Sequence, residues 1–103
     1  MIEVDSHIEF TEQLTNLTGV LDFYADWCGP CKAITPILQE IHESGTNVYK
    51  INVDEQQILA SQYDVRSIPA VFFLRDGKVV DFISGAVAKS KFIEAASKIG
   101  NLK

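Results

Sequence analysis

The stretch Trp27-Cys28-Gly29-Pro30-Cys31-Lys32 contains both cysteines of the chain, with two residues between them. It follows an apolar run over residues 20–25 and opens a segment with the apolar spacing of a helix. Cys28 is therefore expected at a helix N-terminus, where unpaired N–H groups and the macrodipole favour a negative charge such as a thiolate. Because the thiolate is the attacking species in disulfide exchange, such a pair can carry two electrons.

The composition of the chain limits its class. It has 103 residues, 47% of them apolar, which is enough for one domain with a packed core. The net charge of −5 argues against a nucleic-acid binder, which needs a basic patch. No apolar run approaches the about 20 residues that span a bilayer, and the N-terminus is acidic where a signal peptide would be basic. We expect a single domain over residues 1–103 in the cytoplasm.

The two cysteines are not explained by stability. The benefit of a disulfide grows with the length of the loop that it closes, and a two-residue gap constrains the unfolded chain little. Two cysteines in a cytosolic chain of this size do not form a disulfide scaffold either. Two inert buried thiols are the alternative, but Gly29 and Pro30 between them serve geometry rather than packing. Redox chemistry is therefore the better explanation.

Hydrophobic periodicity predicts alternating helices and strands. Strands are expected over residues 20–25, 47–53, 70–74 and 79–83, the last two joined by the hairpin signal Asp76-Gly77. Helices are expected from about residue 8 to 17, from 28 to about 44, from 54 to about 63, and through 92–99. This order favours an α/β fold, with a central mixed β-sheet flanked by helices on both faces.

Local signals refine the ends of these elements. Ser6 and Glu9 have the spacing of a capping box for the first helix, and Gly19 is expected to end that helix. Pro36 lies inside the long helix predicted over residues 28–44 and should kink it. Asp54 is expected to cap the helix that follows it.

Taken in order, these motifs resemble the thioredoxin family, collinearly from about Ile2 to Leu102. Beyond residues 27–32, the resemblance is carried by Asp22-Phe23-Tyr24-Ala25, Lys50-Ile51-Asn52-Val53-Asp54, Val65-Arg66-Ser67-Ile68-Pro69, Gly77 and Gly85. It implies the thioredoxin fold, with the dithiol at the end of the central strand, and disulfide-bearing proteins as substrates. Two residues depart from the family pattern: Tyr24 stands where a tryptophan is usual, and Ala70 where many members have threonine.

The motif residues are expected to divide the chemistry between them. Cys28 would be the nucleophile, its pKa lowered by the helix end, and would form a mixed disulfide with the substrate. Cys31, one helical turn further on, would be more buried and would resolve that intermediate. Trp27 should lie over the dithiol as a partly exposed lid, and Pro30 should restrain the pair. Trp27, Gly29 and Pro30 are expected to contact the substrate.

Asp22 is the most unusual residue outside the motif, because aspartate is disfavoured in strands and a buried charge is costly unless paired. Alternation places it on the strand face opposite Leu21 and Phe23. The pattern alone leaves a buried acid and a surface aspartate equally open. The resemblance favours a buried acid with a raised pKa, which exchanges protons with Cys31 directly or through a water. Lys50 is expected to pair with Asp22 and modulate its titration, a solvated lysine being the alternative.

A substrate groove is expected beside the dithiol. The resemblance implies a cis bond between Ile68 and Pro69, and a proline there leaves the neighbouring backbone free to pair with an extended substrate. Ile68, Ala70, Gly85 and Ala86 would line this groove, with Gly85 allowing another chain to approach closely.

No metal and no cofactor is expected. His7 and His42 fall on different predicted helices, far apart in the sequence, and a zinc site needs convergent ligands with supporting hydrogen bonds. Both histidines are expected on the surface, and Asp26 is expected to be a surface charge.

The leading interpretation is an enzyme, a general protein-disulfide reductase that maintains cell redox homeostasis. The resemblance implies that an NADPH-dependent flavoprotein, thioredoxin reductase, supplies its electrons, and a monomer is the default state. One alternative is a binding module that serves as a rigid subunit of another machine, although a pure scaffold has no need of the dithiol. Another is a reductase dedicated to one partner, such as a ribonucleotide reductase or a peroxiredoxin.

Overall fold

The computed structural model describes residues 1–99; residues 100–103, with Leu102 and the end of the expected domain, lie outside the described residues. Five strands form one sheet in the order β1-β3-β2-β4-β5. Their bounds are β1 Ile2–Glu3, β2 Gly19–Tyr24, β3 Val48–Asn52, β4 Ala70–Arg75 and β5 Lys78–Ser84. β1, β3 and β2 pair in parallel, whereas β4 pairs antiparallel with both β2 and β5. The predicted mixed sheet is confirmed.

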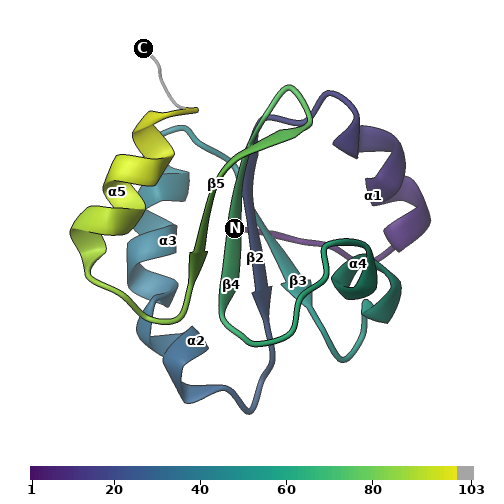
Figure 1. Cartoon of the computed structure of the whole chain (residues 1–103), viewed down its shortest axis with the longest axis horizontal. Helices are drawn as coiled ribbons and strands as arrows, with labels where there is room; N and C mark the ends of the chain where they lie inside the picture. Colours follow the sequence, from purple (N-terminus) through teal and green to yellow (C-terminus); the bar gives the residue numbers. More distant parts are fainter. Residues whose placement is uncertain (100–103) are drawn as a thin grey trace.

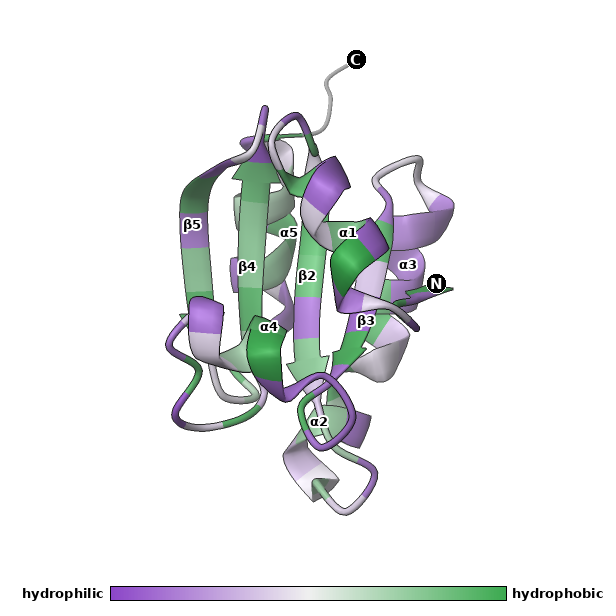
Figure 2. Cartoon of the chain, turned by 90° about the vertical axis from the view of Figure 1, so that its right-hand side faces the viewer, coloured by the Kyte–Doolittle hydropathy of each residue, from purple (hydrophilic) through white to green (hydrophobic). Residues whose placement is uncertain are grey.

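Helices cover both faces of the sheet, as Figure 1 shows. Their bounds are α1 His7–Leu14, α2 Gly29–Ala33, α3 Thr35–Glu43, α4 Gln57–Gln62 and α5 Lys89–Ser97. α1 and α4 lie on one face and α3 and α5 on the other, while α2 lies beyond the end of β2 (Figures 1 and 2). Within residues 1–99, no helix is long and apolar enough to cross a membrane.

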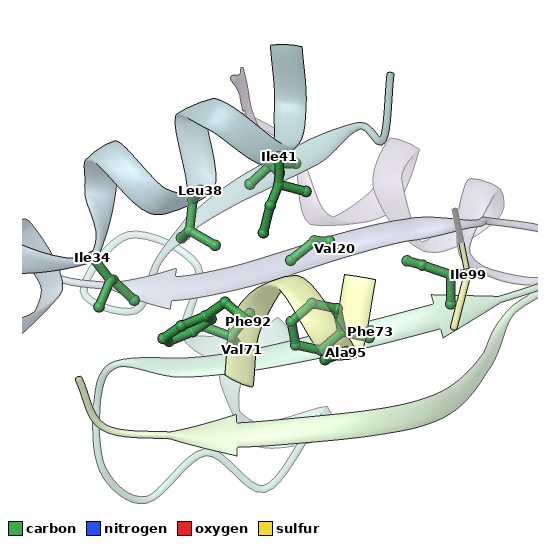
Figure 3. Packing of buried hydrophobic residues seen from close by; sticks show 10 residues of the cluster. Val20, Ile34, Leu38, Ile41, Val71, Phe73, Phe92, Ala95 and Ile99 are labelled. Carbon is green, nitrogen blue, oxygen red and sulfur yellow. The ribbon is translucent and has the colours of Figure 1, made fainter. Parts of the chain in front are cut away.

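Alternating side chains of β2 serve two separate cores. Val20 packs with α3 and α5 in a cluster that also holds Val71 and Phe92 (Figure 3). Leu21 and Phe23 pack on the opposite face, in the cluster that also holds residues of α1 and α4. β2 is therefore buried on both faces, as predicted for a central strand. Its one charged residue is Asp22, on the Val20 face, which gives the strand its hydrophilic band in Figure 2.

Gly19 does not end the first helix, contrary to the prediction. α1 ends at Leu14, and Gly19 is the first residue of β2. A Cβ atom at this position would lie 2.8 Å from the backbone oxygen of Asn47. The glycine thus permits close approach of the segment that leads into β3. At the start of α1 the expected capping contact is present, because the Ser6 Oγ accepts the Glu9 N–H at 3.4 Å.

The single helix predicted over residues 28–44 is also wrong, because the chain forms two helices separated at Ile34. Pro36 has no N–H to donate to the carbonyl of Lys32, and its ring clashes with that carbonyl in a continuous helix. Pro36 lies in the first turn of α3, where a missing N–H costs nothing. The proline therefore ends one helix and begins the next instead of kinking one.

Asp54 does not cap α4, again contrary to the prediction. α4 begins at Gln57, and the residue before it makes no capping hydrogen bond. The loop is held by Asn52, whose Oδ1 accepts the N–H groups of Asp54 and Glu55 at 2.9 and 3.3 Å. The carboxylate of Asp54 is thereby left available to the redox motif.

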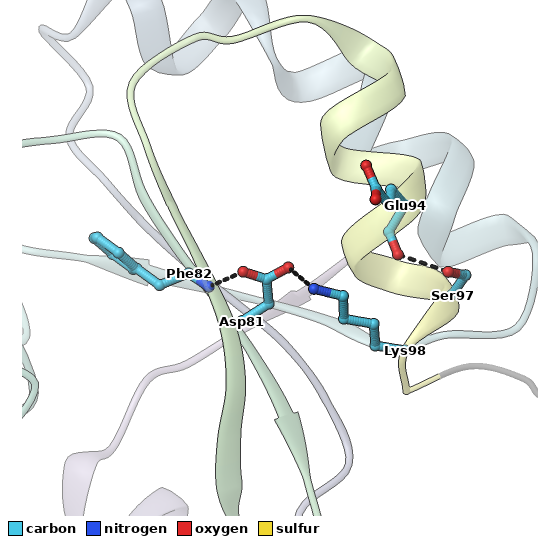
Figure 4. A network of polar contacts seen from close by, with 5 residues as sticks. All are labelled: Asp81, Phe82, Glu94, Ser97 and Lys98. Carbon is cyan, nitrogen blue, oxygen red and sulfur yellow. Dashed lines mark hydrogen bonds and ion pairs between the residues drawn. The ribbon is translucent and has the colours of Figure 1, made fainter.

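The C-terminal helix is attached to the edge strand by an ion pair. Lys98 Nζ lies 2.8 Å from Asp81 Oδ2, and Asp81 also accepts the Phe82 N–H (Figure 4). The hydrogen bond from Lys98 is the main cause that lowers the pKa of Asp81. Such surface pairs contribute little to stability. Phe92 and Ala95, both buried against the sheet, are the main anchors of α5.

Candidate active site

The two cysteines lie just beyond the end of β2, at the start of α2, and form a disulfide with their Cα atoms 5.3 Å apart. Cys28 is the N-cap of α2 with an extended backbone, and its N–H donates to the Ala25 carbonyl at 3.2 Å. Pro30 occupies the first turn of the helix, where its fixed φ is already helical. The motif is therefore held by the strand on one side and the helix on the other.

The sulfur of Cys28 accepts a hydrogen bond from the N–H of Cys31 at 3.2 Å. α2 has only five residues, so the macrodipole of the long helix that we predicted is not available here. The direct N–H contact is the local feature that favours negative charge on this sulfur, because hydrogen bonds to the charged form lower a pKa.

Both cysteines are 4% exposed, so the prediction that Cys31 is more buried than Cys28 is wrong for the disulfide form. Both pack with Ala25 against the half-buried side chains of Val53 and Ile68. The two residues differ instead in what lies beside them. Cys31, but not Cys28, lines a cleft that reaches Asp22.

This cleft, here called the Asp22 cleft, has a volume of about 300 Å³. It is lined by Asp22, Tyr24, Ala25, Asp26, Cys31, Lys32, Thr35 and Lys50. Asp22 is 2% exposed, and its Oδ1 has no hydrogen-bond partner among the described residues. Burial raises the pKa of Asp22 to about 7, against the opposing charge of Lys50 and with a smaller contribution from Glu3. Asp22 can therefore exchange a proton near neutral pH.

Lys50 does not pair with Asp22 as predicted. The two residues are opposite one another on β3 and β2, yet no ion pair joins them, although the structure describes both. The ammonium of Lys50 lies instead 4.2 Å from the centre of the Tyr24 ring, a cation–π contact. The Tyr24 hydroxyl donates to Glu3 Oε2 at 2.6 Å. Burial and this hydrogen bond raise the pKa of Tyr24.

Trp27 is 71% exposed, and its indole N–H donates to Asp54 Oδ2 at 2.9 Å. The indole is therefore tied to the loop after β3 by this hydrogen bond. It lines a groove of about 330 Å³, here called the Trp27 groove, together with Val53, Val65, Arg66, Ser67 and Ile68. Asp54 was not predicted to be the partner of Trp27, because an aspartate before a helix is ordinarily expected to cap that helix.

The Ile68–Pro69 bond is cis, as the resemblance implies. The Pro69 carbonyl accepts the N–H of Gly85 at 2.9 Å. Gly85 has φ +89°, and an added Cβ would meet nothing within 4 Å, so the backbone conformation is what requires glycine there. Ala70 is 1% exposed and packs in the Phe23 cluster, so it does not line a groove as predicted. Ala86 is exposed.

The two histidines lie on different helices, as predicted, His7 on α1 and His42 on α3. His7 and His42 are half-buried, and His42 Nδ1 accepts the N–H of Val48 at 3.1 Å. That contact joins α3 to the start of β3. Within residues 1–99, no group of three or more His, Cys, Asp or Glu side chains is placed to hold a metal ion. Asp26 is exposed, as expected, at the rim of the Asp22 cleft.

Comparison with known proteins identifies this arrangement. The family model described as thioredoxin matches residues 1–98. The chain belongs to the thioredoxin family. Members of this family are thiol–disulfide oxidoreductases, and Cys28 and Cys31 are the redox-active pair of this one.

Individual relatives agree with the family assignment. A thioredoxin of Pyropia yezoensis is 41% identical over 86 residues, which are 81% of this chain and 80% of that protein. The chloroplastic M-type thioredoxin of Spinacia oleracea is 43% identical over 77% of this chain and 45% of its own length. Among solved structures, a mutant thioredoxin from Halobacterium salinarum superposes with a TM-score of 0.86. It is 33% identical, and the match covers 99% of this chain and 92% of that one.

Proposed function

We propose that this thioredoxin-family oxidoreductase acts as a protein-disulfide reductase in which Cys28 attacks and Cys31 resolves. The Cys28 thiolate bonds to one sulfur of a substrate disulfide and displaces the other as a thiolate. The Cys31 thiolate then bonds to Cys28 and displaces the second substrate sulfur. Two electrons pass to the substrate, and the enzyme pair becomes a disulfide. The observation that carries this division is that only Cys31 lines the Asp22 cleft.

Asp22 is proposed as the base for the second step. Cys31 must lose a proton before it attacks, and Asp22 lines the same cleft with its Oδ1 free of protein partners among residues 1–99. A carboxylate with a pKa of about 7 is matched to proton transfer at neutral pH. Lys50 modulates this titration through its charge rather than through a direct ion pair.

The substrate segment is proposed to lie along the Trp27 groove. Trp27 and Ile68 line this groove, and Ile68 also packs against the cysteines. Gly29 and Pro30 are exposed in the motif itself, and Gly85 and Ala86 follow the end of β5 beside the Pro69 carbonyl. An extended chain there would contact apolar surface and backbone, which accepts many different sequences. Ala70 is not part of this proposal, because it is buried.

Insulin reduction tests the proposed function. With dithiothreitol as the electron source, the protein should accelerate precipitation of the insulin B chain, and Cys28→Ser should be no faster than dithiothreitol alone. A wild-type protein without effect would contradict the reductase and leave the rigid binding module as the explanation.

We also propose an NADPH-dependent flavoprotein thioredoxin reductase as the electron donor and the cytoplasm as the compartment. Both rest on the family, and a reducing compartment is where a dithiol is kept in its active form. NADPH oxidation in a mixture of this protein, insulin and the host reductase tests the donor, and absence of oxidation would count against it. Fractionation of host cells with an antibody tests the compartment, because the spinach relative is chloroplastic.

Pro30→His should make the pair more oxidising, by on the order of tens of millivolts. The substitution frees the backbone at the first turn of α2 and adds a group that can carry positive charge beside the Cys28 thiolate, which stabilises the reduced form. Equilibration with glutathione buffers measures the potential. Pro30→Ala is the control, because it frees the backbone without adding a charge. An unchanged potential in both variants would contradict a role for Pro30.

A further inference from the structure

We propose that Tyr24 is a positioning residue, which holds Lys50 on its ring and Glu3 at its hydroxyl and so keeps the Lys50 ammonium away from the Asp22 carboxylate. The proposal rests on the function proposed above for Asp22. It concerns one side of the Asp22 cleft, where three strands bring charged side chains into one row.

The register of the sheet creates this row. Glu3 on β1 is opposite Lys50 on β3, and Lys50 is opposite Asp22 on β2. A lysine between two carboxylates would ordinarily pair with one of them, because opposite charges on neighbouring strands attract. Neither pair forms within the described chain, although the structure describes all three residues.

Tyr24 explains why both pairs are absent. It lies two residues after Asp22 on β2, on the same strand face, and reaches the other two members of the row. The centre of its ring lies 4.2 Å from the Lys50 ammonium nitrogen, and its hydroxyl donates to the Glu3 carboxylate at 2.6 Å. Each charge thus has a partner other than Asp22. A tryptophan, usual in the family at this position, has no hydroxyl to donate to Glu3.

The consequence is that Asp22 keeps a protonation equilibrium suited to neutral pH. The charged groups around it are Lys50 on β3, Glu3 on β1, and Asp26 and Lys32 at the rim of the cleft, whereas β4 presents only Val71 opposite it. Among these groups, a movement of Lys50 toward Asp22 would change the pKa of Asp22 most, because a cation within reach of a carboxylate lowers the pKa of that carboxylate.

The test is the carbonyl ¹³C titration of Asp22 in the oxidised protein, in a Glu3→Gln background. Removing the Glu3 charge leaves Asp22 as the only carboxylate in the row, so Lys50 has one possible partner. Adding Tyr24→Leu should free Lys50 to reach Asp22 and lower the titration midpoint by about one pH unit. Adding Tyr24→Phe, which keeps the ring, should leave the midpoint of the background unchanged.

Lys50→Met separates the effect of Lys50 on the Asp22 midpoint from the effect of water that enters the cleft when the Tyr24 ring is removed. Without Lys50, Tyr24→Leu should no longer lower the midpoint. A fall of the same size with and without Lys50, or no fall with Lys50 present, would overturn the proposal. If Tyr24→Leu does not fold, the proton NMR spectrum of the wild-type protein provides the test. Lys50 ε-methylene protons that lie above a ring must be shifted upfield relative to those of other lysines. Unshifted protons would also overturn it.

These measurements use no turnover and therefore do not depend on the reductase mechanism. If Asp22→Asn resolves mixed disulfides at the wild-type rate, the proposed role of Asp22 fails while the titration result for Tyr24 stands. If Asp22→Asn is slow and Tyr24→Leu leaves the midpoint unchanged, only the positioning role of Tyr24 fails.

Discussion

Cys31→Ser is expected to stop turnover after the first step and to accumulate protein joined to substrate through Cys28. The variant keeps the nucleophile, but serine cannot displace the substrate sulfur from the mixed disulfide. Catalysed insulin reduction should fall to the rate of dithiothreitol alone. Mass spectrometry under non-reducing conditions, after mixing with an oxidised model peptide, should show one stoichiometric adduct.

Cys28→Ser is the matched control for this experiment. It retains Cys31, which lies against the Asp22 cleft and not in the attacking position, so it should form little adduct over the same time. Equal trapping by the two variants would contradict the division between attacking and resolving sulfurs.

Asp22→Asn is expected to stabilise the oxidised protein at pH 8 by up to roughly 4 kcal/mol, because one pKa unit corresponds to about 1.4 kcal/mol. The pKa of Asp22 is about 7 in the folded protein and 3.8 for the free group. Between these values the folded state holds a proton that the unfolded state has released, so wild-type stability falls as pH rises from about 4 to about 7. Asparagine does not ionise, and its contribution stays constant.

Guanidinium unfolding of both proteins at pH 4 and pH 8 measures this effect. The advantage of Asp22→Asn should be small at pH 4 and fully developed at pH 8. An advantage of equal size at both values would show that Asp22 titrates normally in the folded state. Asp26→Asn is a control at an exposed carboxylate of the same cleft. It keeps Asp22, so its stability should still fall between pH 4 and pH 8 as that of the wild type does.

Asp22→Asn should also slow resolution of a mixed disulfide by about 100-fold or more at pH 7, the usual contribution of a positioned acid or base. The defect should shrink at higher pH, where Cys31 ionises without help. Stopped-flow measurement of product thiol release in a single turnover gives the rate directly. A wild-type rate at pH 7 would remove Asp22 from the mechanism.

The sheet and its helices could largely be predicted because their signals are local. The run over residues 20–25 is apolar apart from Asp22, and Asp76-Gly77 marks the hairpin between β4 and β5. β1 has only two residues, too few for any periodicity, and it was not predicted. The break at Ile34 was misjudged because a proline can either kink a helix or start a new one.

The side-chain partners in the site could not be predicted, because they depend on which strands become neighbours. Asp22 was correctly expected to be buried, but its relation to Lys50 is decided by Tyr24 and by Glu3 from a strand that the sequence did not reveal. Likewise Trp27 was placed at the site, but its hydrogen bond to Asp54 joins two loops after β2 and β3.

The reactivity of the two thiols tests the central claim most directly. The reduced protein would be alkylated with iodoacetamide at a series of pH values, and the labelled cysteine identified by peptide mass spectrometry. Cys28 should react first, and the midpoint of its alkylation rate against pH should lie clearly below the pKa of about 8.5 of a free cysteine. Cys31 should react much more slowly. Two thiols that react equally slowly at pH 7 would contradict the account, because no ionised sulfur would then be available to attack a substrate.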